Sequence, residues 1–157
     1  MSRTIYGYGG LGLVVIVAVF VLLYRTPTAP INVPSIVEFG GVSLRIEYAT
    51  TIEARERGLS WRESIAPDQA MLFVFPSDDY YGFWMKDTLV PLDIFWLDSQ
   101  GQVVSIQEEV QPSSYPDVFY PTTPARYVLE TAAGFAREHA IATGTPLLLK
   151  SPPTVSK

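Results

Sequence analysis

The sequence contains no cysteine and only one histidine, His139. Without cysteine there can be no disulfide, no thiol nucleophile, no cysteine zinc site and no acylated cysteine of a lipoprotein. A single histidine cannot build a multi-histidine metal site. We therefore expect no cofactor, and we expect the folded part of the chain to be held together by packing alone.

Recognisable catalytic motifs are missing as well. The chain has no G-x-S-x-G nucleophile elbow to accompany His139 and no phosphate-binding loop. His139 follows Glu138 in a predicted helix, and we interpret it as an exposed helical histidine rather than a member of a catalytic triad. Whether the protein is an enzyme stays open.

Charge is absent from Thr4 to Tyr24, and residues 11–23 read LGLVVIVAVFVLL. About 20 apolar residues in a helix span the ~30 Å hydrocarbon core of a bilayer. We interpret residues 1–25 as an N-terminal transmembrane anchor. The short N-terminus is easily left in the cytoplasm, so we expect the domain outside it. The alternative is a cleaved signal peptide and a secreted domain, although no clean small-residue cleavage pattern follows.

Basic residues are scarce after this segment. Beyond Thr26, nine Lys and Arg face sixteen Asp and Glu, which gives a formal charge of −7. Such a domain repels phosphate backbones and anionic lipid. We expect no nucleic acid partner. The expected contacts are the membrane, through the N-terminal helix, and a cell-envelope glycan or peptide as the candidate ligand.

The rest of the chain divides into three parts. Residues 26–34 contain three prolines and are predicted to form a Pro-rich linker. Residues 35–150 have the length of a single globular domain. Residues 151–157 are predicted to be a disordered tail.

Apolar patterning in the domain predicts short strands. Residues 42–48 alternate apolar and polar side chains, as a half-buried strand does. Thr50 and Glu53 fit a capping box for a short helix that Gly58 ends. A second helix is predicted over 133–141, and further strands over 71–75, 92–97, 102–107, 126–130 and 145–150. The fold class is mostly β (α+β), a small β-barrel or sandwich-like domain with two short helices. Its expected core includes Phe73, Trp84 and Phe95.

The chain resembles the family called domain of unknown function 192. The matching segments, in order, are Glu56-Arg-Gly-Leu59 with Arg62, Met71-Leu-Phe-Val-Phe75, Phe83-Trp-Met-Lys86 with Thr88, Pro91-Leu-Asp93, Val103-Val104, Ala125-Arg-Tyr-Val-Leu-Glu130, Gly134 and Gly144. The chain departs from the family pattern in Gly58-Leu-Ser-Trp-Arg62, in Asp87 where an asparagine is usual, and in Gly144-Thr145. The aspartate weakens any role that needs a neutral amide there. The resemblance implies a compact, mostly β barrel-like fold, often exported, and no established activity.

A short polar cluster lies between two apolar runs, 71–75 and 83–98. Its members Lys86, Asp87, Thr88 and Asp93 lie beside Trp84. In a site, a carboxylate here would orient an amine or polarise a water. In a purely structural interpretation, the Lys86 stem covers Trp84, Asp87 bonds backbone N–H groups and Asp93 caps a loop.

Two more groups of residues carry candidate chemistry. Arg62 or Arg57 can pair with Glu130, either to bind a carboxylate ligand or as a structural clamp. Residues 111–124 form a long loop with four prolines, whose aromatics are placed to stack on a sugar or peptide, or to cover a barrel end. The aromatics of this loop are Tyr115, Phe119 and Tyr120, and a second aromatic group contains Tyr80, Tyr81 and Phe83. If both groups lie at one rim, they frame a pocket whose floor is the cluster from Trp84 to Asp93.

Two function classes follow from these patterns. The first is a ligand-binding or interaction module of the cell envelope. The second is a hydrolase or transferase that uses Asp93, Asp87 or Glu130 as acid or base on envelope glycans or peptides. The lack of a nucleophile motif, a phosphate loop and a metal-ligand set favours the first.

Overall fold

The computed structural model describes residues 35–149 and Val155. The predicted anchor (1–25) and linker (26–34) lie outside the described residues, as does nearly all of the predicted tail (151–157). Among the residues that are described, no helix is long and apolar enough to cross a membrane. The described part is mostly β with two short α-helices, which confirms the broad fold class.

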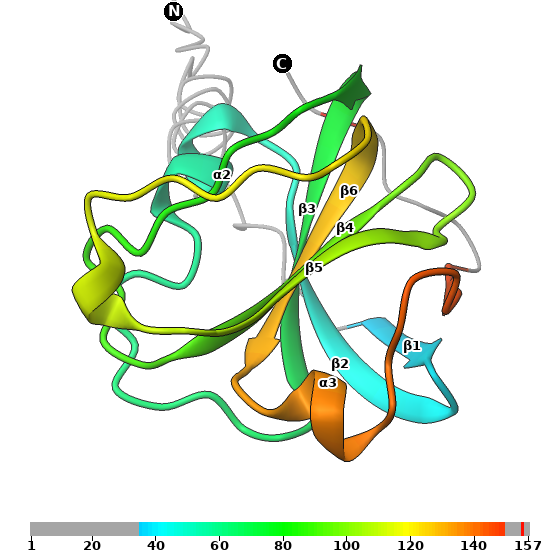
Figure 1. Cartoon of the computed structure of the whole chain (residues 1–157), viewed down its shortest axis with the longest axis horizontal. Coiled ribbons are helices and arrows are strands. Elements are labelled where there is room, and N and C mark those ends of the chain that lie inside the picture. Colours follow the sequence, from blue (N-terminus) through cyan, green and yellow to red (C-terminus); the bar gives the residue numbers. More distant parts are fainter. Residues whose placement is uncertain (1–34, 150–154, 156–157) are drawn as a thin grey trace, which may run out of the picture. The chain divides into compact units, whose positions relative to one another are not determined.

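The strands form one curled sheet (Figure 1). They are β1 (Ser35–Phe39), β2 (Val42–Ala49), β3 (Gln69–Asp79), β4 (Leu92–Leu97), β5 (Val103–Val110), β6 (Ala125–Ala132) and β7 (Leu147–Leu148). The helices are α2 (Ile52–Arg57), the 3-10 turn η1 (Pro112–Ser114) and α3 (Phe135–Glu138). The sheet order is β5-β4-β6-β3-β2-β1-β7, and β2 and β3 pair in parallel while the other neighbours are antiparallel.

The two edges of the sheet come together where the curl closes. Gln102 and Pro146 form an isolated bridge, and the Val103 amide donates to the Thr145 carbonyl at 3.0 Å. The chain segment that contains β7 therefore pairs with β1 on one side and meets the start of β5 on the other. The sheet is therefore a curled half-barrel. This contact covers the two edge strands, which would otherwise expose unpaired backbone groups.

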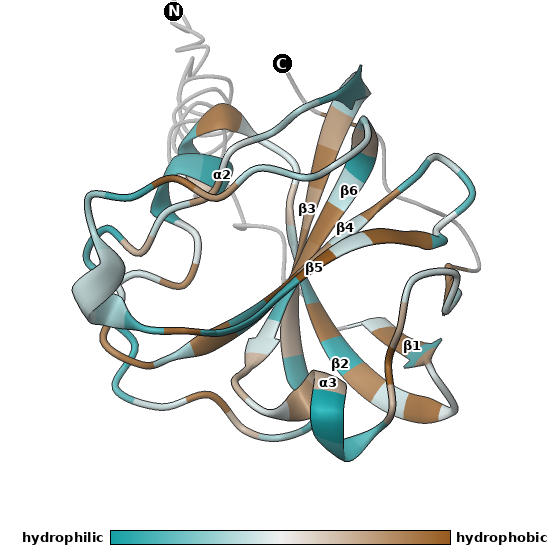
Figure 2. Cartoon of the chain, in the orientation of Figure 1, coloured by the Kyte–Doolittle hydropathy of each residue, from teal (hydrophilic) through white to brown (hydrophobic). Residues whose placement is uncertain are grey.

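Hydrophobic clusters cover both faces of the central strands. All six residues of β4 are buried. Phe95 and Leu97 belong to one cluster, and Ile94 and Trp96 belong to the other, because neighbouring side chains of a strand point to opposite faces. Helix α3 adds Phe135 to the first cluster, whereas α2 packs against the second. Figure 2 shows that α3 contains hydrophilic residues and that hydrophobic and hydrophilic residues alternate along β2.

Helix ends differ from the prediction by a small number of residues. The predicted helix over 133–141 shortens to Phe135–Glu138, because Gly134 is left-handed (φ 88°) and Ala140 is too (φ 52°). The N-cap of α2 is Thr51, whose hydroxyl accepts from the Ala54 amide at 3.1 Å, and not Thr50. Gly58 ends α2 as expected.

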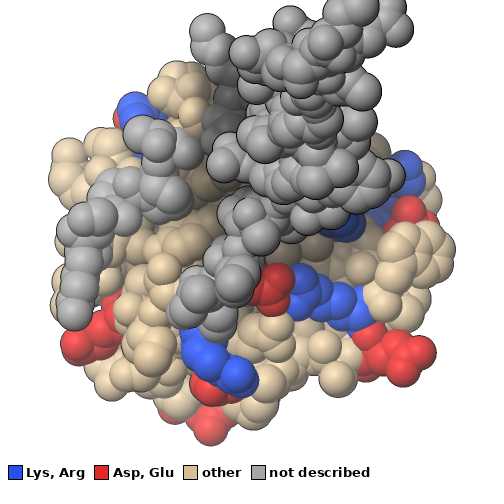
Figure 3. All heavy atoms as spheres, turned by 180° about the vertical axis from the view of Figure 1, so that it is seen from behind, with Lys and Arg blue, Asp and Glu red and all other residues tan. Residues whose placement is uncertain are grey.

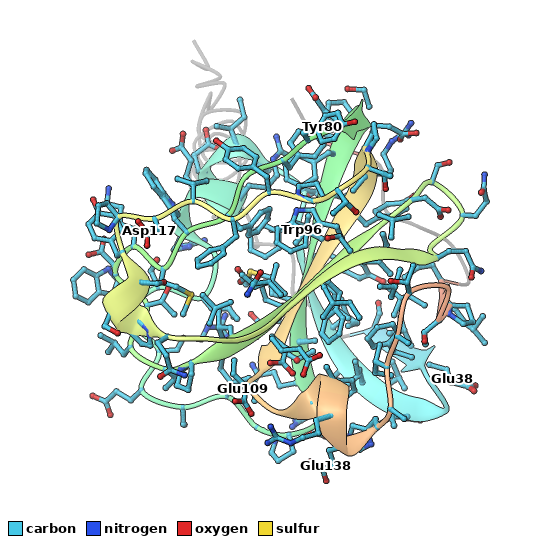
Figure 4. All side chains as sticks on the ribbon, viewed as in Figure 1. Glu38, Tyr80, Trp96, Glu109, Asp117 and Glu138 are labelled. Atoms are coloured by element: carbon cyan, nitrogen blue, oxygen red, sulfur yellow. The ribbon has the colours of Figure 1, made fainter. Side chains whose placement is uncertain are left out.

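Three further expectations change. Ser35–Phe39 forms the strand β1, which the sequence did not indicate, and the strand predicted over 71–75 is longer, because β3 continues to Asp79. Trp84 was expected in the core but is 49% exposed, whereas Trp96 is only 1% exposed. The chain alternates around Trp84, so that its neighbours Phe83 and Met85 point inward. Trp96 points into the molecule from β4, and its indole N–H donates to the Tyr81 carbonyl at 2.8 Å (Figure 4).

Candidate functional site

A pocket of about 530 Å³ lies between α2 with the residues that follow it, the middle of β3 and residues 81–88. We call it the α2 pocket. The helix that forms one wall lies in the crossover between β2 and β3, since parallel neighbouring strands require such a connection. Aromatic, cationic and hydroxyl side chains share the lining, which consists of Arg55, Glu56, Arg57, Gly58, Leu59, Ser60, Phe73, Phe75, Tyr81, Gly82, Phe83, Trp84, Lys86 and Thr88.

The cations in the pocket differ from the other cations of the domain. Residues 35–149 contain seven Lys and Arg. Four of them form salt bridges, namely Arg45 with Asp68, Arg62 with Glu47, Arg126 with Asp78 and Arg137 with Glu109. The remaining three are Arg55, Arg57 and Lys86, which make no salt bridge with any described residue and all line the α2 pocket. On the face drawn in Figure 3, most Lys and Arg lie beside Asp or Glu.

Arg55 is held in a fixed position. Its Nη1 donates to the carbonyls of Thr50 and Val74, each at 2.9 Å, and its guanidinium lies 5.3 Å from the centre of the Phe75 ring. Both Nη1 hydrogens are used in this way. The donors on Nε and Nη2 make no hydrogen bond to another described residue.

Lys86 and Trp84 form a second group of the lining. The Lys86 ammonium lies 5.8 Å from the centre of the Trp84 ring, at the distance of a cation–π contact. Trp84 also meets the Tyr115 ring at 6.0 Å, edge to face. The exposed part of Trp84 is therefore continuous with the loop over residues 111–124.

The two aromatic segments lie side by side, as the rim hypothesis requires. Phe83 and Phe119 form a bridge with hydrogen bonds of 2.9 and 2.8 Å between their backbones. Gly82 allows the close approach, because a Cβ there would lie 2.6 Å from the Tyr120 ring and 2.7 Å from Val118. Tyr120 therefore borders the pocket through Gly82 without being part of the lining.

Two left-handed residues connect the turns beside Lys86. Trp61 (φ 64°) donates its amide to the carbonyl of Asp87 (φ 56°) at 2.8 Å. Ser60 donates its hydroxyl to the Lys86 carbonyl at 3.3 Å. Non-glycine residues in this region carry strain and are concentrated at functional sites. These contacts set the position of Lys86 relative to the end of α2.

Asp93 lies on the other face of the sheet. It is fully buried, and its carboxylate oxygens accept from the amides of Glu109 at 2.7 Å and Ala136 at 2.8 Å. Ala136 belongs to α3, which covers the face opposite α2. Asp93 therefore does not form the floor of a pocket with Lys86, and the structure supports its role as a cap. Figure 4 shows Glu109 near α3.

The predicted pairing of Arg62 with Glu130 does not form. Arg62 instead makes two hydrogen bonds to the Glu47 carboxylate, at 2.6 and 2.7 Å, and Gln69 donates to the same carboxylate. Glu130 is buried, with 5% of its surface exposed. Burial raises the pKa of Glu130 to about 8, and the positive charge of Arg62 offsets part of that effect. Arg57 is likewise not paired with Glu130.

Of the predicted site residues, Trp84, Lys86 and Thr88 line the pocket. Tyr115 and Tyr120 contact its border, while Asp87, Asp93, Arg62 and Glu130 are not in the lining. Arg55 and Ser60 were missed. The sequence feature that could have identified Arg55 was the pair of arginines in the last turn of α2, directly before the glycine that ends the helix.

Metal-binding groups are not gathered in the described part of the chain. No group of three or more His, Asp or Glu residues is placed there to hold an ion. His139 is half-buried rather than exposed, and its ring lies 4.5 Å from the Phe135 ring. The phenylalanine side chain takes part of the histidine surface away from solvent.

Comparisons with known proteins agree with this architecture. The model of the DUF192 family, described as an uncharacterized ACR, matches residues 35–149. A proposed transcription regulator of Sinorhizobium meliloti 1021 has a similar structure, with a TM-score of 0.65 and 35% identity over 68% of this chain and 81% of that one. A protein of unknown function from Novosphingobium aromaticivorans DSM 12444 gives a TM-score of 0.68 and 27% identity over 77% of this chain and 90% of that one. No curated protein matches the chain.

Proposed function

Because the chain belongs to the DUF192 family, whose description states no activity, we propose a function from the geometry of its site. The domain is a ligand-binding module of the cell envelope, held outside the cytoplasm by residues 1–25 as a membrane anchor. The ligand is a cell-envelope glycan or peptide fragment, and it binds in the α2 pocket. The carrying observation is the pocket itself, since about 530 Å³ falls within the roughly 300–1,000 Å³ of small-molecule sites.

The composition of the pocket supports binding. Its aromatic side chains provide flat apolar surface, and a small number of polar groups converge on the same space. Trp84 is half exposed although it is large and apolar, and it lies at the border where the loop over 111–124 begins to contribute. Exposed aromatic surface of this kind commonly marks an interaction site.

An acid–base enzyme is the second candidate, and the positions of the carboxylates argue against it. Both oxygens of Asp93 already accept backbone hydrogen bonds. In the ladder between β4 and β6, Asp93 is paired with Thr131 and Ile94 with Glu130, so that Asp93 and Glu130 point to opposite faces of the sheet. A glycosidase-like pair needs two carboxyl groups across one open cleft.

The test is a ligand screen on the full chain in nanodiscs, with thermal unfolding as the readout. Envelope glycan fragments and short peptides are screened first. Each ligand that raises the unfolding temperature is then measured on Trp84→Ala and on Trp61→Ala. The two tryptophans are both exposed, but only Trp84 lines the pocket. Trp61 contacts the turn beside Lys86 through its backbone amide, which Trp61→Ala keeps.

We expect binding to be lost in Trp84→Ala and kept in Trp61→Ala. A ligand that binds both variants equally would show that it occupies another surface. Turnover of a glycan or peptide that depends on Asp93, Asp87 or Glu130 would support the enzyme instead.

A further inference from the structure

Resting on the proposed function, we infer that the α2 pocket recognises an organic anion. The ligand presents a carboxylate or phosphate group to the cations and places a ring or other flat apolar body against the aromatic side chains. The general size and shape of the pocket do not require this charge. The inference comes from the distribution of cations over the domain.

That distribution is uneven in a domain with few cations. Sixteen acidic residues and seven basic ones lie within 35–149. The three basic residues without a carboxylate partner among the described residues meet at one pocket, where Glu56 is the only acidic residue of the lining. Glu53 lies near enough to Arg55 for the arginine charge to contribute to the lowered pKa of Glu53, but it forms no salt bridge with Arg55 and is not part of the lining. The lining therefore carries a local excess of positive charge.

Arg55 provides a preorganised binding group. Its hydrogen bonds to the Thr50 and Val74 carbonyls fix the guanidinium, and its Nε and Nη2 donors are left for a ligand. A planar guanidinium with two neighbouring donors matches a carboxylate or phosphate in bidentate geometry. Because the side chain is already held, little conformational entropy is lost when an anion binds.

Arg57 and Lys86 complement this group from two different segments. Arg57 lies in the last turn of α2, and Lys86 lies beyond the Phe83–Phe119 bridge. Both side chains are exposed. They can reorient toward an anion, whereas Arg55 cannot, and their charge acts at short range. Screening limits the effect of distant acids, because the Debye length is about 8 Å at physiological salt.

The aromatic part of the lining specifies the body of the ligand. Phe75 and Tyr81 stack at 3.6 Å, Phe73 and Phe83 meet edge to face at 4.8 Å, and Trp84 extends the surface outward. Rings packed on such a surface gain stacking and burial. An inorganic anion would contact only the cationic side chains, and a neutral sugar would contact only the aromatic rings. A ligand that carries an anionic group on a ring contacts both.

Three matched pairs of probes test the charge of the ligand. They are N-acetylmuramic acid with N-acetylglucosamine, indole-3-acetate with indole-3-acetamide, and phenyl phosphate with phenol. Dissociation constants are measured by ligand-observed NMR on the full chain in nanodiscs. The variants are Lys86→Gln, Arg57→Gln and Trp84→Ala, and the charge control is Arg137→Gln, which removes the same charge from an exposed arginine on α3.

We expect the anion of at least one pair to bind about tenfold or more tightly than its neutral partner. Lys86→Gln and Arg57→Gln should each raise the dissociation constant of that anion by about three- to tenfold, and Arg137→Gln should leave this constant unchanged. If the acid and the neutral compound bind equally in every pair, and Trp84→Ala still loses binding, the anion inference is wrong. The proposed function of the pocket would then stand. If no probe binds, or if Trp84→Ala binds all of them as wild type does, both proposals fail.

Discussion

Asp93 connects three parts of the chain through one carboxylate. It is buried in β4 and accepts hydrogen bonds from the amides of Glu109 in β5 and Ala136 in α3. The Glu109 backbone is left-handed (φ 51°), so its amide points to Asp93 at the cost of some strain. This explains why an acidic residue is stable in a strand whose other residues are all apolar.

Asp93→Asn should therefore lower the free energy of unfolding by about 1–3 kcal/mol, because an amide has one acceptor oxygen and turns its NH₂ toward the second backbone donor. The chemical denaturation midpoint measures this loss. Asp98→Asn is a suitable control, since Asp98 caps an exposed turn through a single oxygen. Equal or higher stability of Asp93→Asn would show that the carboxylate is under strain of the kind found at functional sites.

Glu130 gives the domain a predictable pH dependence. Burial raises the pKa of Glu130 to about 8 in the folded state, while the unfolded carboxyl ionises near its ordinary value of 4.5. Between these values the folded state keeps a proton that the unfolded state has lost. The free energy of unfolding should therefore fall as the pH rises from about 4.5 to 8 and then level off.

Glu130→Gln removes this contribution. At about 1.4 kcal/mol per pH unit the fall amounts to roughly 4–5 kcal/mol over the window. The variant should lose less stability than wild type between pH 5 and 8, and should be at least as stable at pH 8. Urea denaturation at several pH values measures the difference. Parallel curves for the two proteins would contradict the raised pKa.

At the scale of an element, α2 begins at a cap that can be tested directly. The Thr51 hydroxyl accepts from the Ala54 amide, whereas the neighbouring Thr50 contributes its carbonyl to Arg55. Loss of an N-cap hydroxyl costs typically about 1 kcal/mol. Thr51→Ala should therefore reduce stability by about this amount, and Thr50→Ala should have little effect, because a backbone carbonyl survives the substitution.

Since α2 carries Arg55 and Arg57 into the pocket, the cap has a second consequence. Thr51→Ala should increase amide hydrogen exchange at the start of α2 more than in the sheet, because helix ends are the first parts to open. Hydrogen exchange by mass spectrometry measures both regions in one experiment. If Thr50→Ala rather than Thr51→Ala gives this result, the cap is Thr50 and not Thr51.

At the scale of the whole molecule, the anchor proposal predicts where the protein is found. A helix over residues 1–25 would keep the full-length protein in the membrane fraction, with the domain accessible from outside. Protease added to intact spheroplasts should remove the domain after Thr26. Protection of the domain would reverse the proposed orientation, and a mature N-terminus near Ala29 would replace the anchor by a cleaved signal.

The curled sheet determines which residues can meet. Residues 55–57 and 86 are far apart in the chain, and they share a pocket because the β2–β3 crossover and residues 81–88 lie on the same face of the sheet. Asp93 is much closer to Lys86 in sequence, yet it points to the opposite face and pairs with α3. Distance along the sequence is therefore a poor guide to the composition of the site.

Local patterns in the sequence determined the elements whose causes are local. Alternation predicts β2, the apolar run predicts β4 with its observed bounds, and Gly58 marks the end of α2. These features depend on a few neighbouring residues, as side-chain periodicity and backbone freedom do. The mostly β fold class follows from their sum. The cap of α2 was misplaced by one residue because two adjacent threonines offer the same hydroxyl.

Only the tertiary structure decided which partners the polar and aromatic residues have. Trp84 and Trp96 are equally apolar, but their surroundings differ. Trp84 follows the inward-facing Phe83 at the border of the α2 pocket, whereas Trp96 lies in β4, which is covered on both faces. Arg62 pairs with Glu47 in β2 rather than with Glu130 in β6. The strand β3 lies between these two strands in the sheet, and the Arg62 guanidinium reaches the carboxylate of Glu47. Strand order is a long-range property that arises from the packing of the whole domain, and it decides which cations are left to line the pocket.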